Sequence, residues 1–170
     1  APHVFSDAPH ESFKMIFLDY FQHFVKTLTH IKDVKEVLWL IKAHPTSKDY
    51  NEEGLVEKML SKYKKYDHIK LFPNHIHLYS CLNLVDTVIT TRGTIGLEFA
   101  ACFEKKPIIL ADAPYSNLGF TIEPKNEEEY FNILKNVEKI TPLSKLEKLN
   151  AKKTFYFFEC IQLDELKSSV

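Results

Sequence analysis

The segment Thr90–Glu98 (TTRGTIGLE) places residues suited to phosphate binding where an apolar run gives way to a helical pattern. Gly93 permits a tight turn, and Thr94 falls among the first residues of the helix. Backbone N–H groups at a helix start, joined by a hydroxyl, favour the binding of an anion. Arg92, the only arginine in the chain, adjoins this turn. We therefore predict that Arg92, Gly93 and Thr94 bind a nucleotide phosphate.

The carboxylate of Glu98 extends this predicted site. Glu98 follows Thr94 by about one helical turn, so both side chains are expected to face the same cleft. A carboxylate there can accept hydrogen bonds from ribose hydroxyls. The alternative is purely structural: Thr94 caps the helix, Gly93 makes the turn and Glu98 is solvated. The chain contains neither a GxGxxG dinucleotide motif nor a Walker GxxxxGK[ST] motif.

A second motif, KAHP at 42–45, follows the apolar run Val37–Ile41. Lys42 and His44 alternate with Ala43, so their side chains leave the same face of a strand at its end. Pro45 then stops the strand, because proline has no N–H to donate. We predict that Lys42, His44 and Pro45 belong to the phosphate site, with His44 also able to donate to a leaving group. The alternative is a strand-end histidine that is bonded to a neighbouring carbonyl.

A third candidate is the loop Asp112–Gly119 (DAPYSNLG), which follows another apolar run. We expect Tyr115 to stack on a sugar or base and Ser116 or Asn117 to hydrogen-bond to it; the alternative is an ordinary loop with a partly buried tyrosine. His75 and His77 alternate, but they have no Cys, Asp or Glu partner at ligand spacing. The sequence therefore predicts no metal site.

Short apolar runs and helical patterns alternate along the chain, which predicts βαβ units and a parallel sheet. Handedness and burial rules then favour an α/β, doubly wound, Rossmann-like sheet with helices on both faces. The carboxyl ends of its strands meet at one edge, which would bring the three motifs together. The predicted strands span residues 3–7, 36–43, 68–72, 85–91 and 107–111. The predicted helices span residues 12–32, 52–65, 75–83, 93–104, 126–139 and 142 onward.

The length of 170 residues suits one domain, and we expect a Rossmann-like nucleotide-binding domain over residues 1–140. Residues 141–170 are expected to form a helical tail that packs back on this domain or toward a missing N-terminal domain. The first residue is Ala1 rather than Met, and the opening residues resemble the middle of a fold. We therefore expect this chain to be a fragment of a longer protein.

The composition excludes several classes of protein. The chain is 45% hydrophobic and 26% charged, which predicts a folded core rather than disorder. Its formal net charge of −1 argues against a nucleic-acid partner. No apolar run approaches the roughly 18 residues of a membrane span. The three cysteines lie in apolar segments and are interpreted as reduced, buried thiols, which predicts a cytoplasmic protein.

Taken in order, these motifs resemble the C-terminal half of bacterial capsule polysaccharide synthesis proteins. These are GT-B glycosyltransferases, a group that includes the CMP-Kdo transferases. The resemblance covers about residues 1–125. It rests on His44-Pro45, on Gly93-Thr94 with Glu98, on a "KPVI"-like strand at Lys106–Ile109 and on Tyr115. Arg92 is a departure, since related proteins often have a small or polar residue there, and it could alter the choice of nucleotide.

The resemblance implies the donor-nucleotide half of a capsule or surface polysaccharide glycosyltransferase, with a CMP-sugar as the favoured donor. His44 and the Thr94 hydroxyl would then hold the nucleotide phosphate, with no metal or other cofactor. The N-terminal domain would bring the acceptor, so no catalytic residue is assigned and the fragment is expected to be inactive alone. A lipid-linked saccharide acceptor would place the whole enzyme peripherally at the inner membrane. The alternatives are a CDP-glycerol, CDP-ribitol or UDP-sugar transferase, and a non-catalytic nucleotide- or phosphate-binding module.

Overall fold

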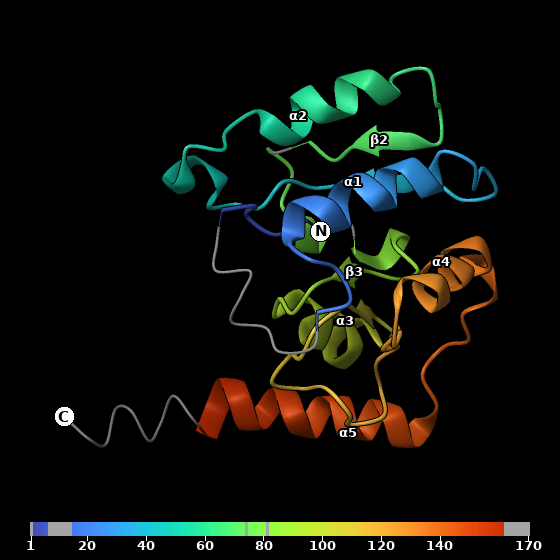
Figure 1. The fold of residues 1–170 in the computed structure, drawn as a ribbon. Helices are drawn as coiled ribbons and strands as arrows, with labels where there is room; N and C mark the ends of the chain where they lie inside the picture. The colour runs from blue at the N-terminus through green and yellow to red at the C-terminus, as the bar shows by residue number, and fades with distance from the viewer. Residues whose placement is uncertain (1, 7–14, 74, 81, 162–170) are drawn as a thin grey trace.

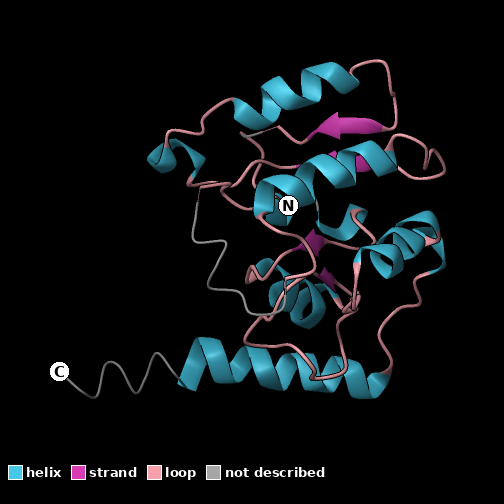
Figure 2. Ribbon diagram, viewed as in Figure 1, coloured by secondary structure: helices cyan, strands magenta, loops and turns pink. Residues whose placement is uncertain are grey.

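The computed structural model describes residues 2–6, 15–73, 75–80 and 82–161 as a mixed α/β arrangement (Figures 1 and 2). In Figure 1, α2 lies at the top, α1 crosses in front of the middle and α5 runs along the bottom. The helices are α1 (Tyr20–Ile31), α2 (Leu55–Leu60), α3 (Ile95–Phe103), α4 (Glu127–Lys135) and α5 (Lys145–Tyr156). The strands are β1 (Trp39–Ile41), β2 (Ile69–Leu71), β3 (Ile89–Thr90) and β4 (Ile108–Ile109).

The strands form two small parallel sheets. In the first, β1 pairs with β2, and Trp39 lies opposite Ile69. In the second, β3 pairs with β4, and Ile108 also makes a parallel bridge to Ile122. Within the part of the chain that the structure describes, the two sheets do not join. The predicted α/β class and the parallel pairing are therefore confirmed, whereas a full doubly wound sheet is not observed.

The helix predicted from residue 12 begins only at Tyr20, because Asp19 caps it. The Asp19 carboxylate accepts a hydrogen bond from the Gln22 N–H at 2.6 Å, and the Asp19 backbone is extended. Residues 12–14 lie outside the described residues. From Tyr20 onward the helix buries one side, on which Phe24, Leu28 and Ile31 lie at helical spacing.

Several other predicted elements are shorter than expected or absent. A left-handed Gly54 (φ +75°) delays α2 to Leu55, and the predicted helix 75–83 is replaced by two 3-10 turns at Leu78–Ser80 and Leu82–Leu84. The strand predicted over residues 3–7 is not formed by its described residues. Instead, the backbone N–H groups of Phe5 and Ser6 donate to the Glu52 carboxylate at 2.8 and 2.7 Å. Position 7 lies outside the described residues.

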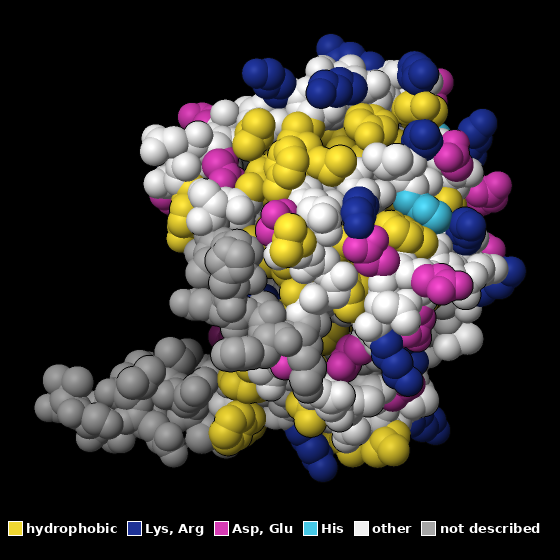
Figure 3. All heavy atoms as spheres, in the orientation of Figure 1, with side chains coloured by type: hydrophobic (Ala, Val, Ile, Leu, Met, Phe, Trp, Pro, Cys, Tyr) yellow, Lys and Arg dark blue, Asp and Glu magenta, His cyan; other side chains and the backbone are white. Residues whose placement is uncertain are grey.

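The larger of two apolar cores joins β1 and β2 with α1, α2 and α4. Helices α1 and α4 run side by side: Lys26 pairs with Glu127 at 2.7 Å, and the hydroxyls of Thr27 and Tyr130 lie 2.9 Å apart. Figure 3 shows hydrophobic side chains gathered over α1 and α2, where Phe21 is 48% exposed. These contacts fix α1 against α4 and the larger core.

The smaller core packs α5 against α3 and β4. Ser144 begins α5 with a reciprocal capping box to Glu147, whose carboxylate also pairs with Lys106 at 2.5 Å. The Lys106 ammonium and the Ser144 backbone N–H lower the pKa of Glu147 to about 2. Residues 145–156 thus pack back on the rest of the chain, while the division at residue 140 stays a prediction.

The structure shows one cysteine, Cys102, on the surface of α3. Cys102 is exposed on α3, so the prediction that it is a buried thiol is wrong. None of the described helices is both long and apolar enough to cross a bilayer.

We predict that buried His23 makes the stability of this chain depend on acid pH. Its ring is 4% exposed, and burial lowers its pKa to about 3. Below pH 6.5 the unfolded chain binds a proton that the folded chain refuses, so stability falls as pH drops from about 6.5 toward 3. Between pH 7 and pH 5 this histidine should cost about 2 kcal/mol of unfolding free energy.

Urea unfolding at the two pH values tests this. His23→Phe should reduce the loss between pH 7 and pH 5 by about that amount, whereas His75→Gln, at an exposed position, should leave it unchanged. An equal acid loss in wild type and His23→Phe would contradict the prediction.

Candidate functional site

The carboxyl ends of β1 and β4 lie at the same edge of the molecule, beside the start of α1. The His3 ring stacks on Tyr20 at the start of α1, 4.5 Å between centroids, and on His44 after β1, 5.1 Å between centroids. The Ile16 N–H, just ahead of α1, donates to the Leu110 carbonyl after β4 at 3.2 Å. Because β3 runs parallel to β4, its carboxyl end lies at this edge too. The structure thus brings the KAHP corner and the TTRGT turn to one edge.

At the KAHP corner, His44 is held by its neighbours. Its Nδ1 lies 2.8 Å from the Thr46 hydroxyl, and Pro45 is exposed at the corner itself. The His3 ring covers one face of the imidazole. The orientation of the His44 ring is therefore set by a stacked ring and a hydroxyl together. Sequence reasoning missed His3, which it assigned to a strand.

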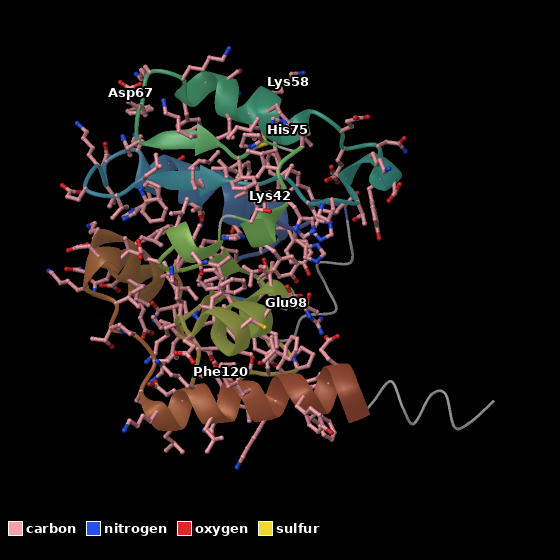
Figure 4. The ribbon with its side chains drawn as sticks, turned by 180° about the vertical axis from the view of Figure 1, so that it is seen from behind. Lys42, Lys58, Asp67, His75, Glu98 and Phe120 are labelled. Carbon is pink, nitrogen blue, oxygen red and sulfur yellow. The ribbon has the colours of Figure 1, made fainter. Side chains whose placement is uncertain are left out.

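Lys42 is directed differently from His44. Its ammonium lies over the Phe72 ring, 4.8 Å from the centroid, just beyond the end of β2. It also lines a groove between β1 and β3. Figure 4 shows Lys42 on the upper part of the molecule and Glu98 on the lower part, on α3. The structure places Lys42 near the predicted site, but the Lys42 ammonium makes a cation–π contact with the Phe72 ring.

The TTRGT turn has the close packing that glycine allows. The Gly93 N–H donates to the Thr90 hydroxyl at 3.2 Å, and a Cβ on Gly93 would lie only 2.9 Å from that oxygen. Thr94 occupies the N-cap position of α3, but its exposed side chain makes no capping hydrogen bond. No carboxylate among the described residues forms an ion pair with half-buried Arg92. The start of α3 therefore presents a hydroxyl and a cation together.

Tyr115 supports this turn from beneath. It is 2% exposed, its hydroxyl donates to the Gly93 carbonyl at 2.5 Å, and its ring stacks on buried Phe120. Burial raises the pKa of the hydroxyl, which stays a neutral donor. A buried ring offers no face to a sugar, so the placement does not support the predicted stacking. Ser116 closes the same loop, because its hydroxyl accepts the Ala113 N–H at 2.8 Å.

Glu98 has a partner that the sequence analysis missed. The Tyr79 hydroxyl donates to the Glu98 carboxylate, and this bond raises the pKa of Tyr79 to about 12. The Tyr79 ring also stacks on His77 and on Phe103 of α3. The loop after β2 is thus tied to α3. Tyr79 lay inside the helix predicted over residues 75–83, and nothing in the sequence signalled its contact with Glu98.

The edge can bind an anion at the start of α3, where Arg92, the Thr94 hydroxyl and the first backbone N–H groups of the helix lie together. Across the described ranges, no group of three or more His, Cys, Asp or Glu side chains is arranged to hold a metal ion. Comparison of the chain with protein-family models, with curated proteins and with solved structures gives no match.

We predict that Gly96 is required because Tyr115 packs against it. A Cβ at Gly96 would overlap the Tyr115 hydroxyl and lie 3.1 Å from its Cζ. Gly96→Ala should therefore destabilise the fold by about 1–3 kcal/mol, although alanine is the better helix former.

A double-mutant cycle with Tyr115→Phe, measured by urea unfolding, checks the cause. Tyr115→Phe removes the overlapping oxygen, so the cost of Gly96→Ala should fall in that background. An undiminished cost would show that Tyr115 is not the obstacle.

Proposed function

We propose that this chain is the donor-nucleotide half of a capsule-type glycosyltransferase, with a CMP-sugar as the favoured donor. The observation that carries the proposal is the shared edge: the His3–His44 stack and the Ile16–Leu110 hydrogen bond bring both motifs beside the start of α1. In open parallel sheets, ligands bind outside the carboxyl ends of the strands. The residue types at this edge favour an anionic ligand.

In this proposal the donor phosphate is bound at the start of α3. Arg92 and the Thr94 hydroxyl contact its oxygens, and the partial positive charge of the helix start stabilises them. His44, oriented by Thr46, reaches the phosphate from the other motif. When the sugar–phosphate bond breaks, negative charge grows on the leaving phosphate, and these fixed donors stabilise it.

The ribose would be held by Glu98. The Tyr79 hydroxyl donates to one of its oxygens, which fixes the carboxylate on α3 while leaving it capacity to accept further hydrogen bonds. Ser116, behind the turn, is bonded to Ala113 and supports the loop shape. In this role Tyr79 is a positioning residue.

Turnover in this proposal needs an N-terminal domain of the same protein that brings the acceptor and a base. A lipid-linked saccharide acceptor would bring the whole enzyme to the inner face of the cytoplasmic membrane. A CDP-glycerol, CDP-ribitol or UDP-sugar donor would use the same phosphate site, so the nucleotide has to be identified by binding.

We predict that His44→Ala and Thr94→Ala each weaken the binding of CMP about 5- to 150-fold, the equivalent of about 1–3 kcal/mol. Arg92→Gln should weaken CMP binding in the same range, because a charge-assisted contact is lost. Calorimetry with CMP, CDP, UDP and GDP would measure this and rank the nucleotides.

The matched control is Thr29→Val, at an exposed position on α1 away from this edge, which should leave the affinity unchanged. Unchanged affinity in both His44→Ala and Thr94→Ala would remove the proposed site. Equal binding of all four nucleotides and of inorganic phosphate would favour a phosphate-binding module over a transferase.

We predict a distinct signature for Glu98→Gln. A neutral amide accepts hydrogen bonds more weakly, so this variant should weaken the binding of cytidine and of CMP by a similar factor. Inorganic phosphate should bind as before. Saturation-transfer NMR can follow all three ligands, with Glu128→Gln on α4 as the control. A loss for phosphate equal to that for CMP would place Glu98 at the phosphate instead.

A further inference from the structure

The side of α5 that faces away from the rest of the molecule exposes large apolar side chains. Helix α5 runs along the bottom of Figure 1, and buried Ala151 packs its inner side into the smaller core. On the other side, Leu146 and Leu149 are 66% and 49% exposed. Tyr156 and Phe157, at the end of the helix, are 60% and 52% exposed. Leu149 and Tyr156 are two turns apart, so these side chains form one patch, and a continuous apolar patch marks an interaction surface.

Lysines are interleaved with these apolar side chains. Lys145 and Lys153 are exposed, and each lies four residues from Leu149, which places both on the same face of the helix. Among the described residues, no carboxylate forms an ion pair with either lysine. Figure 3 shows hydrophobic and basic side chains next to one another along the lower edge, where α5 lies. The outer face of α5, as we name this surface, consists of Lys145, Leu146, Leu149, Lys153, Tyr156 and Phe157.

The carboxylates that contact α5 lie on its inner side. Glu104, at the end of α3, pairs with Lys148 and Lys152 at 2.6 and 2.8 Å. Glu147 of α5 itself pairs with Lys106 at 2.5 Å. These ion pairs join α5 to the rest of the molecule and use the negative charges there. The positive charge of the outer face is therefore not neutralised by them.

This pattern of charge favours one kind of occupant over the others. Two copies of α5 that paired through their outer faces would bring lysines together without a carboxylate to neutralise them. A buried protein interface is disfavoured as well, because lysine is depleted from interface cores. At a lipid surface, apolar side chains enter the boundary of the acyl chains while lysines extend their ammonium groups to the phosphates. Apolar and lysine side chains on one helix face suit that environment.

We infer that the outer face of α5 binds the surface of a bilayer that contains anionic lipid, with the helix lying parallel to that surface. The leucines and aromatic rings enter the headgroup region, and Lys145 and Lys153 contact lipid phosphates. The 12 residues of α5 extend over about 18 Å, and the helix lies at the bottom of the molecule in Figure 1, so a flat surface can meet the whole face. This inference rests on α5 and does not depend on the proposed function.

Flotation of the full chain with lipid vesicles tests the inference. One set of vesicles contains equal parts of phosphatidylglycerol and phosphatidylcholine, and the other contains phosphatidylcholine alone. The chain should bind the anionic vesicles at least about tenfold more tightly than the neutral ones, because two lysines face the lipid phosphates. Raising the salt concentration from about 0.05 M to about 0.5 M should remove most of this difference, since salt screens exposed charges.

Two lysine variants measure the contribution of charge. Lys145→Gln combined with Lys153→Gln should weaken binding to the anionic vesicles about 30-fold, or about fivefold for each lysine. The matched control combines Lys58→Gln with Lys62→Gln, which removes the same charge from exposed positions at the other end of the molecule. Figure 4 shows Lys58 at the top and α5 at the bottom. The control should change the affinity by no more than about twofold.

An apolar variant distinguishes insertion from charge attraction alone. Leu146→Ser should weaken binding to the anionic vesicles about fivefold, because less apolar surface leaves water. Its matched control is Leu18→Ser, ahead of α1, where the leucine is 71% exposed. That control should bind as the unmutated chain does. If Leu146→Ser fails to fold, the lysine variants and the dependence on salt still decide.

Absence of binding, or equal binding to neutral and anionic vesicles, would overturn the inference. A loss in the Lys58 and Lys62 control equal to that in the α5 variant would also overturn it, because the attraction would then come from the charge of the whole chain. Sedimentation that shows dimers which Leu146→Ser dissociates would assign the outer face to a second copy instead. Nucleotide affinity plays no part in these readouts, so failure here leaves the proposed function separately testable.

Discussion

The stack of three rings, Tyr20 on His3 and His3 on His44, is the contact on which the arrangement of the site depends. It fixes the end of β1 to the start of α1, and the Ile16–Leu110 hydrogen bond fixes the end of β4 to the same place. Two sheets that are not joined among the described residues thereby share one edge. Without that edge, the KAHP corner and the TTRGT turn would be unrelated surface features.

A second constraint shapes the turn itself. Thr90 and Tyr115 pack so closely on Gly93 and Gly96 that a Cβ at either glycine would meet an oxygen. This packing accounts for the burial of Tyr115 and for the exposure of Thr94 directly above it. The Gly93 carbonyl accepts from both the Tyr115 hydroxyl and the Gly96 N–H, which fixes the turn at the start of α3, and the start of a helix favours an anion.

The sequence predicted best where local chemistry decides the outcome. Asn126 caps α4, accepting the Glu129 N–H at 2.9 Å, and the predicted strand ranges contain all four strands of the described residues. Contacts between residues that are far apart in the sequence could not be predicted from it. The residues around Tyr115 in the sequence do not indicate that it packs against Gly96. The residues around Glu98 likewise do not indicate that Tyr79 donates a hydrogen bond to it. The first helix was predicted to begin too early because Phe13 and Phe17 extend the helical spacing of Phe21 and Phe24 to positions before Asp19, and the Asp19 cap fixes the start at Tyr20 instead.

The groove and the candidate site meet at a single point of the fold. The groove lies between the β1 and β3 segments, and in open α/β sheets ligands bind outside the carboxyl ends of the strands. His44 follows the strand on one side of the groove, and Gly93 follows the strand on the other. The width of this groove therefore also sets the distance between the two motifs.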